Sequence, residues 1–139
     1  MPKKPLRFLY TGIRVRNLER SIRFYRALGF RIKFRGKMEH GGEFVHLTQP
    51  RSKLRIELNY YPKGNRFYTP FRPGSEFDHF GFYSEDPDGW LRAMRRAGGK
   101  EAIPTWTEGD QRIGYVNDPD GATLEVFGPK KKPRRRRKS

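Results

Sequence analysis

Hydrophobic and polar residues alternate with two different periods along the first half of the chain, and these periods predict where its strands and helix lie. Four segments alternate as strands with one buried face do: 6–15, 30–38, 44–48 and 54–60. A segment between the first two repeats its apolar residues at helical spacing, at Leu18, Ile22, Tyr25 and Leu28. Asn17 is a typical helix N-cap and Gly29 a typical C-terminal stop. The predicted order is βαβββ.

The second half of the chain follows the same order after a loop rich in Pro, Gly and aromatic residues. A helix is expected to begin at Asp86-Pro87-Asp88 and to end at Gly98-Gly99. The strands expected around this helix are 79–84, 104–107, 112–117 and 123–127. The chain therefore contains a strand–helix–strands unit twice.

A nearly constant offset between the two halves supports this repeat. Tyr10-Thr11-Gly12 and His79-Phe80-Gly81 lie 69 residues apart, and an offset of 68 relates Glu57 to Glu125. We therefore predict an α+β fold of two tandem βαβββ modules. One domain of residues 6–127 would contain module one (6–61), a linker (62–76) and module two (77–127).

Length and composition narrow the class of protein. A chain of 139 residues has the length of one domain with one sizeable core. The absence of cysteine excludes a disulfide scaffold and a thiolate zinc site. No apolar run approaches the ~20 residues of a membrane span, and no charged-then-apolar secretory segment opens the chain. We expect a cytoplasmic protein.

The net charge of +16 is concentrated at one end of the chain. Lys130–Lys138 contains eight positive residues and no acidic one, which leaves +8 on residues 1–129. We expect a short basic extension at 1–5 and a disordered basic tail at 128–139. The tail is either an electrostatic arm for nucleic acid, acidic lipid or an acidic partner, or a solubilising segment. No motif of a nucleic-acid-reading fold accompanies it, so sequence-specific recognition is not expected.

Four polar residues recur at matched positions on apolar strands: Tyr10, Glu57, His79 and Glu125. Buried polar groups are costly unless they are paired or bind a metal. Imidazole and carboxylate groups suit a divalent ion such as Zn, Ni, Co, Mn or Fe, and open coordination positions would let it polarise a substrate oxygen. Each residue also has a structural explanation, as a satisfied core histidine, a carboxylate facing solvent or arginine, or a core tyrosine.

Five stretches of the sequence resemble the vicinal oxygen chelate superfamily, and most closely its glyoxalase I branch: 11–15, 21–30, 56–58, 78–82 and 117–126. The resemblance implies paired βαβββ modules whose curved sheets enclose a metal cleft. It also implies a small-molecule substrate and a homodimer, because the site in related proteins often forms between two subunits. Glu57, His79 and Glu125 match family ligands, whereas Tyr10 replaces the first-strand histidine.

The resemblance also suggests residues that contact the substrate. Arg14 matches a family arginine that contacts the carboxylate of glutathione, and Tyr61 stands where the family has an asparagine. The aromatic residues of the linker region either line a pocket for an apolar ligand or pack between the modules: Tyr60, Tyr61, Phe67, Tyr68 and Phe71.

The resemblance favours a metal-dependent lyase or isomerase of the glyoxalase I type. It would transfer a proton on a 2-oxo or hemithioacetal substrate through a metal-bound enediolate. Glu125 is the expected base, Glu57 its counterpart and His79 the anchor of the ion. The alternative is a small-molecule binding protein of the bleomycin-resistance type, without catalysis. A third hypothesis is a protein that binds nucleic acid non-specifically through Lys130–Lys138.

Overall fold

The structure, a computed structural model, describes residues 2–131 and contains the predicted unit twice. Module one consists of β1 (Arg7–Arg14), α1 (Leu18–Ala27), β2 (Arg31–Lys37), β3 (Glu43–Thr48) and β4 (Arg55–Tyr60). Module two consists of β5 (Phe77–Tyr83), α2 (Pro87–Arg96), β6 (Lys100–Glu108), β7 (Gln111–Asn117) and β8 (Thr123–Pro129). The predicted α+β fold of paired βαβββ modules is confirmed.

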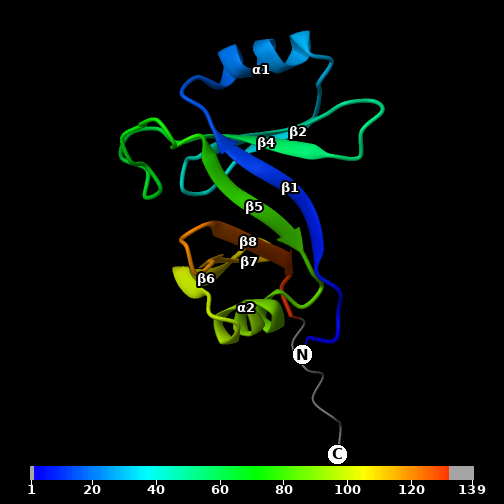
Figure 1. Cartoon of the computed structure of the whole chain (residues 1–139), viewed down its shortest axis with the longest axis vertical. Helices are drawn as coiled ribbons and strands as arrows, with labels where there is room; N and C mark the ends of the chain where they lie inside the picture. The colour runs from blue at the N-terminus through cyan, green and yellow to red at the C-terminus, as the bar shows by residue number, and fades with distance from the viewer. Residues whose placement is uncertain (1, 132–139) are drawn as a thin grey trace, which may run out of the picture.

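All eight strands belong to one mixed sheet with the order β2-β3-β4-β1-β5-β8-β7-β6. Within each module the last strand runs parallel to the first, so β4 pairs with β1 and β8 with β5. The two modules meet where β1 and β5 pair as antiparallel neighbours, and these strands lie side by side at the centre of Figure 1. The first strand of each module is therefore in contact with both modules.

One helix covers the outer face of each module, at opposite ends of the molecule in Figure 1. The Asn17 side chain accepts a hydrogen bond from the Arg20 N–H (2.9 Å), as the predicted N-cap requires. The inner face of α1 packs on one apolar cluster and that of α2 on another, and the fully buried members include Leu47, Leu58, Leu91 and Val126. Because each helix fills the outer face of its own module, the opposite face of the sheet remains free to form a cavity.

Two boundaries differ from the prediction. Strand β6 begins at Lys100, before the expected 104, because Pro104 lies in an edge strand next to a register shift, where its missing N–H is tolerated. Strand β8 continues to Pro129, and the Lys130 N–H donates to the Asp110 carbonyl (2.9 Å). The predicted tail therefore starts two residues too early, and Lys132–Ser139 lie outside the described residues.

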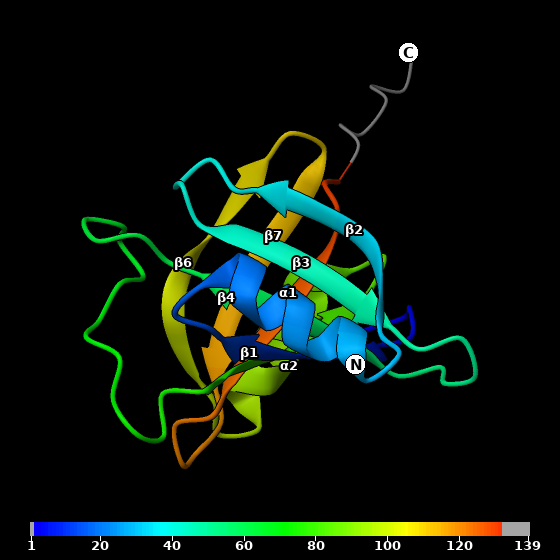
Figure 2. The same cartoon turned by 90° about the horizontal axis from the view of Figure 1, so that it is seen from above.

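The linker between the modules contains neither helix nor strand, as predicted, and projects as a long loop in Figure 2. Neither of the two helices within residues 2–131 is long and apolar enough to cross a membrane.

Candidate active site

A cavity of about 720 Å³ lies on the inner face of the sheet, with walls from both modules. Seven aromatic rings line it: Tyr10, Phe34, Phe44, Tyr61, Phe67, Tyr115 and Phe127. Its polar lining includes the carboxylates Glu57 and Glu125 and the imidazoles His46 and His79. Three of the four residues selected from the sequence are almost completely buried, since Tyr10, Glu57 and His79 are exposed by 3%, 7% and 2%.

Glu57 lies between two imidazole rings. Its Oε2 atom is 2.5 Å from Nε2 of His46, which faces it from the neighbouring strand β3. Its Oε1 atom is 3.2 Å from Nε2 of His79, which comes from β5 of the other module. Glu57 therefore contacts histidines of both modules.

Glu125 lies between two phenol groups. Tyr10 of β1 donates its hydroxyl to Oε1 (2.8 Å), and Tyr115 of the neighbouring strand β7 donates its hydroxyl to Oε2. His79 Nε2 is farther away, at 3.9 Å from Oε2. Glu125 thus receives two hydrogen bonds from neutral donors.

Two glycines on the central strands make room for the Tyr10 and His79 side chains, each of which reaches the glutamate of the other module. A Cβ atom at Gly12 would lie 2.7 Å from the His79 ring, and one at Gly81 would clash with the Tyr10 ring. Gly12 lies two residues after Tyr10, and Gly81 lies two residues after His79. The absence of a side chain at these positions lets Tyr10 and His79 reach the centre of the cavity.

A second carboxylate fixes the orientation of His79. Asp78 Oδ2 lies 2.7 Å from His79 Nδ1 and also accepts the hydroxyl hydrogen of Tyr61 (2.7 Å). An ionised carboxylate can only accept, so Nδ1 of His79 carries a hydrogen. His79 Nε2 is then directed toward Glu57 and the Tyr10 hydroxyl, which lies 3.2 Å away.

The two glutamates have opposite pKa shifts. Burial by itself would raise the pKa of Glu57, but the hydrogen bonds and charges of His46 and His79 outweigh it and lower the pKa to about 2. Burial raises the pKa of Glu125, the charge of Glu57 raises it further, and the charge of His79 and the two phenol hydrogen bonds compensate in part. Burial, followed by the charge of Glu125, raises the pKa of Tyr10 and Tyr115. Glu57 is therefore the carboxylate that stays ionised at neutral pH, and Glu125 is the carboxylate that gains a proton more easily.

The predicted metal ligands converge on one side of the cavity, and metal binding by them stays a prediction. No group of three or more His, Asp or Glu side chains within residues 2–131 is arranged to hold a metal ion. The donor atoms are instead hydrogen-bonded to one another. His46 contacts a carboxylate oxygen of Glu57, and the Tyr10 hydroxyl lies between His79 and Glu125. A buried phenol with a raised pKa is also a poor ligand. As arranged, the cluster is closed by its own hydrogen bonds, and no catalytic step is derived through a metal ion.

The two predicted substrate contacts have different positions. Tyr61 lines the cavity, where it holds Asp78. Arg14 is not part of the lining: its buried guanidinium donates to the Thr69 hydroxyl (3.1 Å) and carbonyl (2.5 Å), and lies against the ring of Phe71. In this structure Arg14 anchors the linker, so a contact of Arg14 with substrate stays a prediction.

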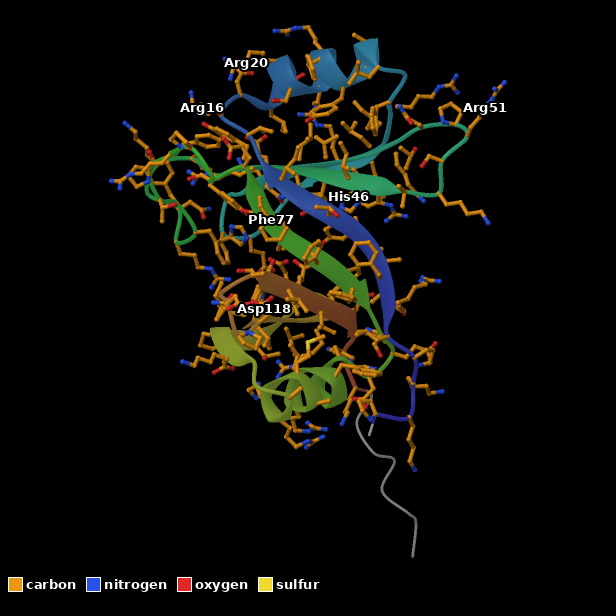
Figure 3. The ribbon with its side chains drawn as sticks, in the orientation of Figure 1. Arg16, Arg20, His46, Arg51, Phe77 and Asp118 are labelled. Atoms are coloured by element: carbon orange, nitrogen blue, oxygen red, sulfur yellow. The ribbon has the colours of Figure 1, made fainter. Side chains whose placement is uncertain are left out.

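Two residues of the cluster, His46 and Tyr115, are not among those predicted from the sequence. Figure 3 labels His46 on the side of module one that faces module two. The offset of 69 that relates Tyr10 to His79 also relates His46 to Tyr115. These residues are the cross-strand neighbours of Glu57 and Glu125, so the repeat itself was a signal that could have found both.

The paired modules and the central cavity agree with the comparison to known families. The chain matches the model of the Glyoxalase/Bleomycin resistance protein/Dioxygenase superfamily over residues 7–126. It therefore belongs to this superfamily.

Two curated relatives within the superfamily are named as lactoylglutathione lyases. The chain is 30% identical over 129 residues to the lactoylglutathione lyase of Haemophilus influenzae, covering 88% of this chain and 92% of that protein. It is also 30% identical over 142 residues to a putative lactoylglutathione lyase of Brassica oleracea var. gemmifera, covering 95% of this chain but 49% of that protein. The chain thus spans about half the length of the plant relative.

Among solved structures, the methylmalonyl-CoA epimerase of Mycobacterium tuberculosis shares the fold. Its TM-score is 0.73 at 22% identity, over 89% of this chain and 88% of the epimerase. The family model and the relatives of 30% identity together establish the family of this chain.

Proposed function

We propose that this protein is an enzyme that transfers a proton on a carbon next to a carbonyl group of a small molecule. The observation that carries the proposal is the pair Glu57 and Glu125. These carboxylates line one cavity, Glu57 is buried and Glu125 is partly buried, and their hydrogen-bond partners differ: imidazoles for Glu57 and phenols for Glu125. Two carboxyl groups whose environments separate their proton affinities are typical of acid–base catalysis. A 2-oxo compound or a hemithioacetal, the substrate class of the glyoxalase I type, suits this chemistry.

Glu125 is the proposed base. It would take the proton from carbon and return it either to the neighbouring carbon or to the opposite face of the same carbon. Glu57, held by two imidazoles, would remain ionised and keep His79 in place. The negative charge that develops on the carbonyl oxygen needs donors. Once Glu125 has taken the proton it no longer needs both phenol hydrogens, so the hydroxyl of Tyr10 or Tyr115 could turn from Glu125 to that oxygen.

Exchange of deuterium from solvent into a substrate tests this proposal. The probes are the hemithioacetals of methylglyoxal with 2-mercaptoethanol and with glutathione, followed by NMR in D₂O. We expect the chain to accelerate exchange on at least one of them and Glu125→Gln to reduce the rate by about 10³-fold or more, since the base is lost. Glu101→Gln, a surface variant on β6 outside the cavity lining, is the matched control. Unchanged exchange in a folded Glu125→Gln protein would reject Glu125 as the base.

The bleomycin-resistance type remains the alternative, a binding protein without catalysis. Two observations favour it: the polar groups already satisfy one another, and seven aromatic rings line the cavity. Tight binding of a small molecule without solvent exchange on any carbonyl probe would support this alternative over the enzyme.

Three further predictions are untested. The homodimer stays a prediction. The interaction of Lys130–Lys138 with nucleic acid or an acidic partner also stays a prediction, and Lys132–Lys138 lie outside the described residues. The cytoplasmic location is the third.

A further inference from the structure

The cavity lining contains more acidic residues than lysines and arginines, which is the reverse of the whole chain. Five of the 15 Asp and Glu residues line it: Glu43, Glu57, Asp78, Glu108 and Glu125. Of the 31 Lys and Arg residues, the lining contains two, Arg7 and Arg55, although the net charge of the chain is +16. Acidic residues are therefore concentrated around the space that a ligand would occupy.

The two arginines are held by aromatic rings. The Arg55 guanidinium lies over the Phe34 ring at 5.8 Å from its centroid. Arg7 is exposed and lies over the ring of Tyr83, which is not part of the lining. These contacts favour the positions that the cations already occupy. They provide no paired, bidentate clamp of the kind that recognises a carboxylate or phosphate.

Other groups of the cavity favour a positive ligand. Glu43 and Glu108 form no ion pair within residues 2–131, and one oxygen of Glu108 accepts the Glu39 N–H (3.1 Å). The face of an aromatic ring attracts cations because of its negative quadrupole, and the Phe67 ring of the cavity wall shows this, since the Arg66 guanidinium lies over it at 4.8 Å from its centroid. Both features lower the energy of an ammonium or guanidinium group in this space and raise that of an anion.

We infer that the cavity binds an organic ligand with an apolar body and a positively charged amine, and that it discriminates against anions of the same shape. This inference rests on the proposed function, because it names the substrate class of the same site: a small carbonyl compound that carries an ammonium group.

Three probes of similar shape and different charge test the inference: benzylamine, benzyl alcohol and benzoate. Isothermal titration calorimetry at pH 7 and 150 mM NaCl measures their Kd values, with salt present to suppress binding of benzoate to the basic surface. We expect benzylamine to bind at least tenfold more tightly than benzoate, with benzyl alcohol between them. Glu108→Gln should reduce the difference about threefold or more, because it removes a cavity carboxylate without touching the Glu57–Glu125 cluster.

Glu101→Gln is the control, since it removes an acidic residue from the same strand but outside the lining. It should leave the preference unchanged. Equal or tighter binding of benzoate, a preference that is the same in Glu108→Gln, or no binding of any probe would overturn the inference. Deuterium exchange is a separate readout: a preference for benzylamine with no exchange on any carbonyl probe would reject the enzyme and keep the ligand class.

Discussion

The two modules place equivalent side chains in the cavity but interchange imidazole and phenol. Module one has a tyrosine on its first strand and a histidine on its third, whereas module two has a histidine on its first and a tyrosine on its third. The equivalent pairs are Tyr10 and His79, His46 and Tyr115, and Glu57 and Glu125. Because each first-strand residue contacts the glutamate of the other module, Glu57 receives two imidazoles and Glu125 receives two phenols.

This difference shows how one scaffold produces two carboxyl groups with distinct properties. A histidine can carry a positive charge, so it stabilises the ionised form of Glu57 by charge as well as by hydrogen bonding. A phenol supplies only a hydrogen bond, which does not compensate for burial at Glu125. The asymmetry of the partners, not the position in the fold, is the reason why Glu125 is the proposed base.

The largest effect that separates the modules is expected from removing each glutamate. Glu57→Ala should lower the free energy of unfolding by about 3–5 kcal/mol, because it leaves two buried imidazoles without their carboxylate. Glu125→Ala should cost about 1–3 kcal/mol, since the phenols it leaves are neutral. Chemical denaturation of both variants measures the difference, and the identical change in volume makes the comparison direct. An equal loss in the two variants would contradict the distinction.

Acid should affect the Glu57 half of the cluster more strongly. Its pKa is lowered from 4.5 to about 2 on folding, so the stability it contributes is present above pH 4.5 and is lost as the pH falls toward 2. That loss corresponds to about 3 kcal/mol. Unfolding curves between pH 6 and pH 2.5 measure it, and Glu57→Gln should have a flatter profile than the original chain. A profile that is unchanged by the substitution would show that other carboxyl groups cause the acid dependence.

Substitution of the two glycines at the module boundary should lower the stability of the fold by different amounts. Gly81→Ala places a methyl group in the Tyr10 ring, and Gly12→Ala places one 2.7 Å from His79, so both should destabilise the fold by about 1–3 kcal/mol. The clash at Gly81 is closer and should cost more. Thermal unfolding gives the order, and Gly81→Ala combined with Tyr10→Ala should recover part of the loss. Without this recovery, the contact with Tyr10 would not be the cause.

Chelation should have the smallest effect. Because the donor atoms of the cluster are bonded to one another, EDTA should change Tm by less than about 2 °C and elemental analysis should find well below one equivalent of metal. Tyr10→His sharpens this comparison, because it introduces the imidazole that the family has on its first strand and should increase the stabilisation by Zn²⁺ or Ni²⁺. One equivalent of tightly held metal in the unmodified chain would reject the hydrogen-bonded arrangement.

The sequence was sufficient to predict the repeated βαβββ order, the helix caps and the convergence of Tyr10, Glu57, His79 and Glu125. These features depend on local periodicity, on capping residues such as Asn17 and on the offset between the copies, all of which can be read along the chain. The end of β8 and the length of β6 were less predictable, because strand ends depend on the neighbouring strand, as the bond from Lys130 to Asp110 shows.

The tertiary structure alone decided which partner each residue has. The sequence places Tyr10 and His79 on first strands, but only the antiparallel pairing of β1 with β5 sends each of them to the glutamate of the other module. It also brings His46 and Tyr115 into the cluster and directs Arg14 to the linker, away from the cavity. The physical reason is that periodicity determines which face of a strand a side chain occupies, whereas charge, burial and hydrogen bonding depend on strands that are distant in sequence and adjacent in space.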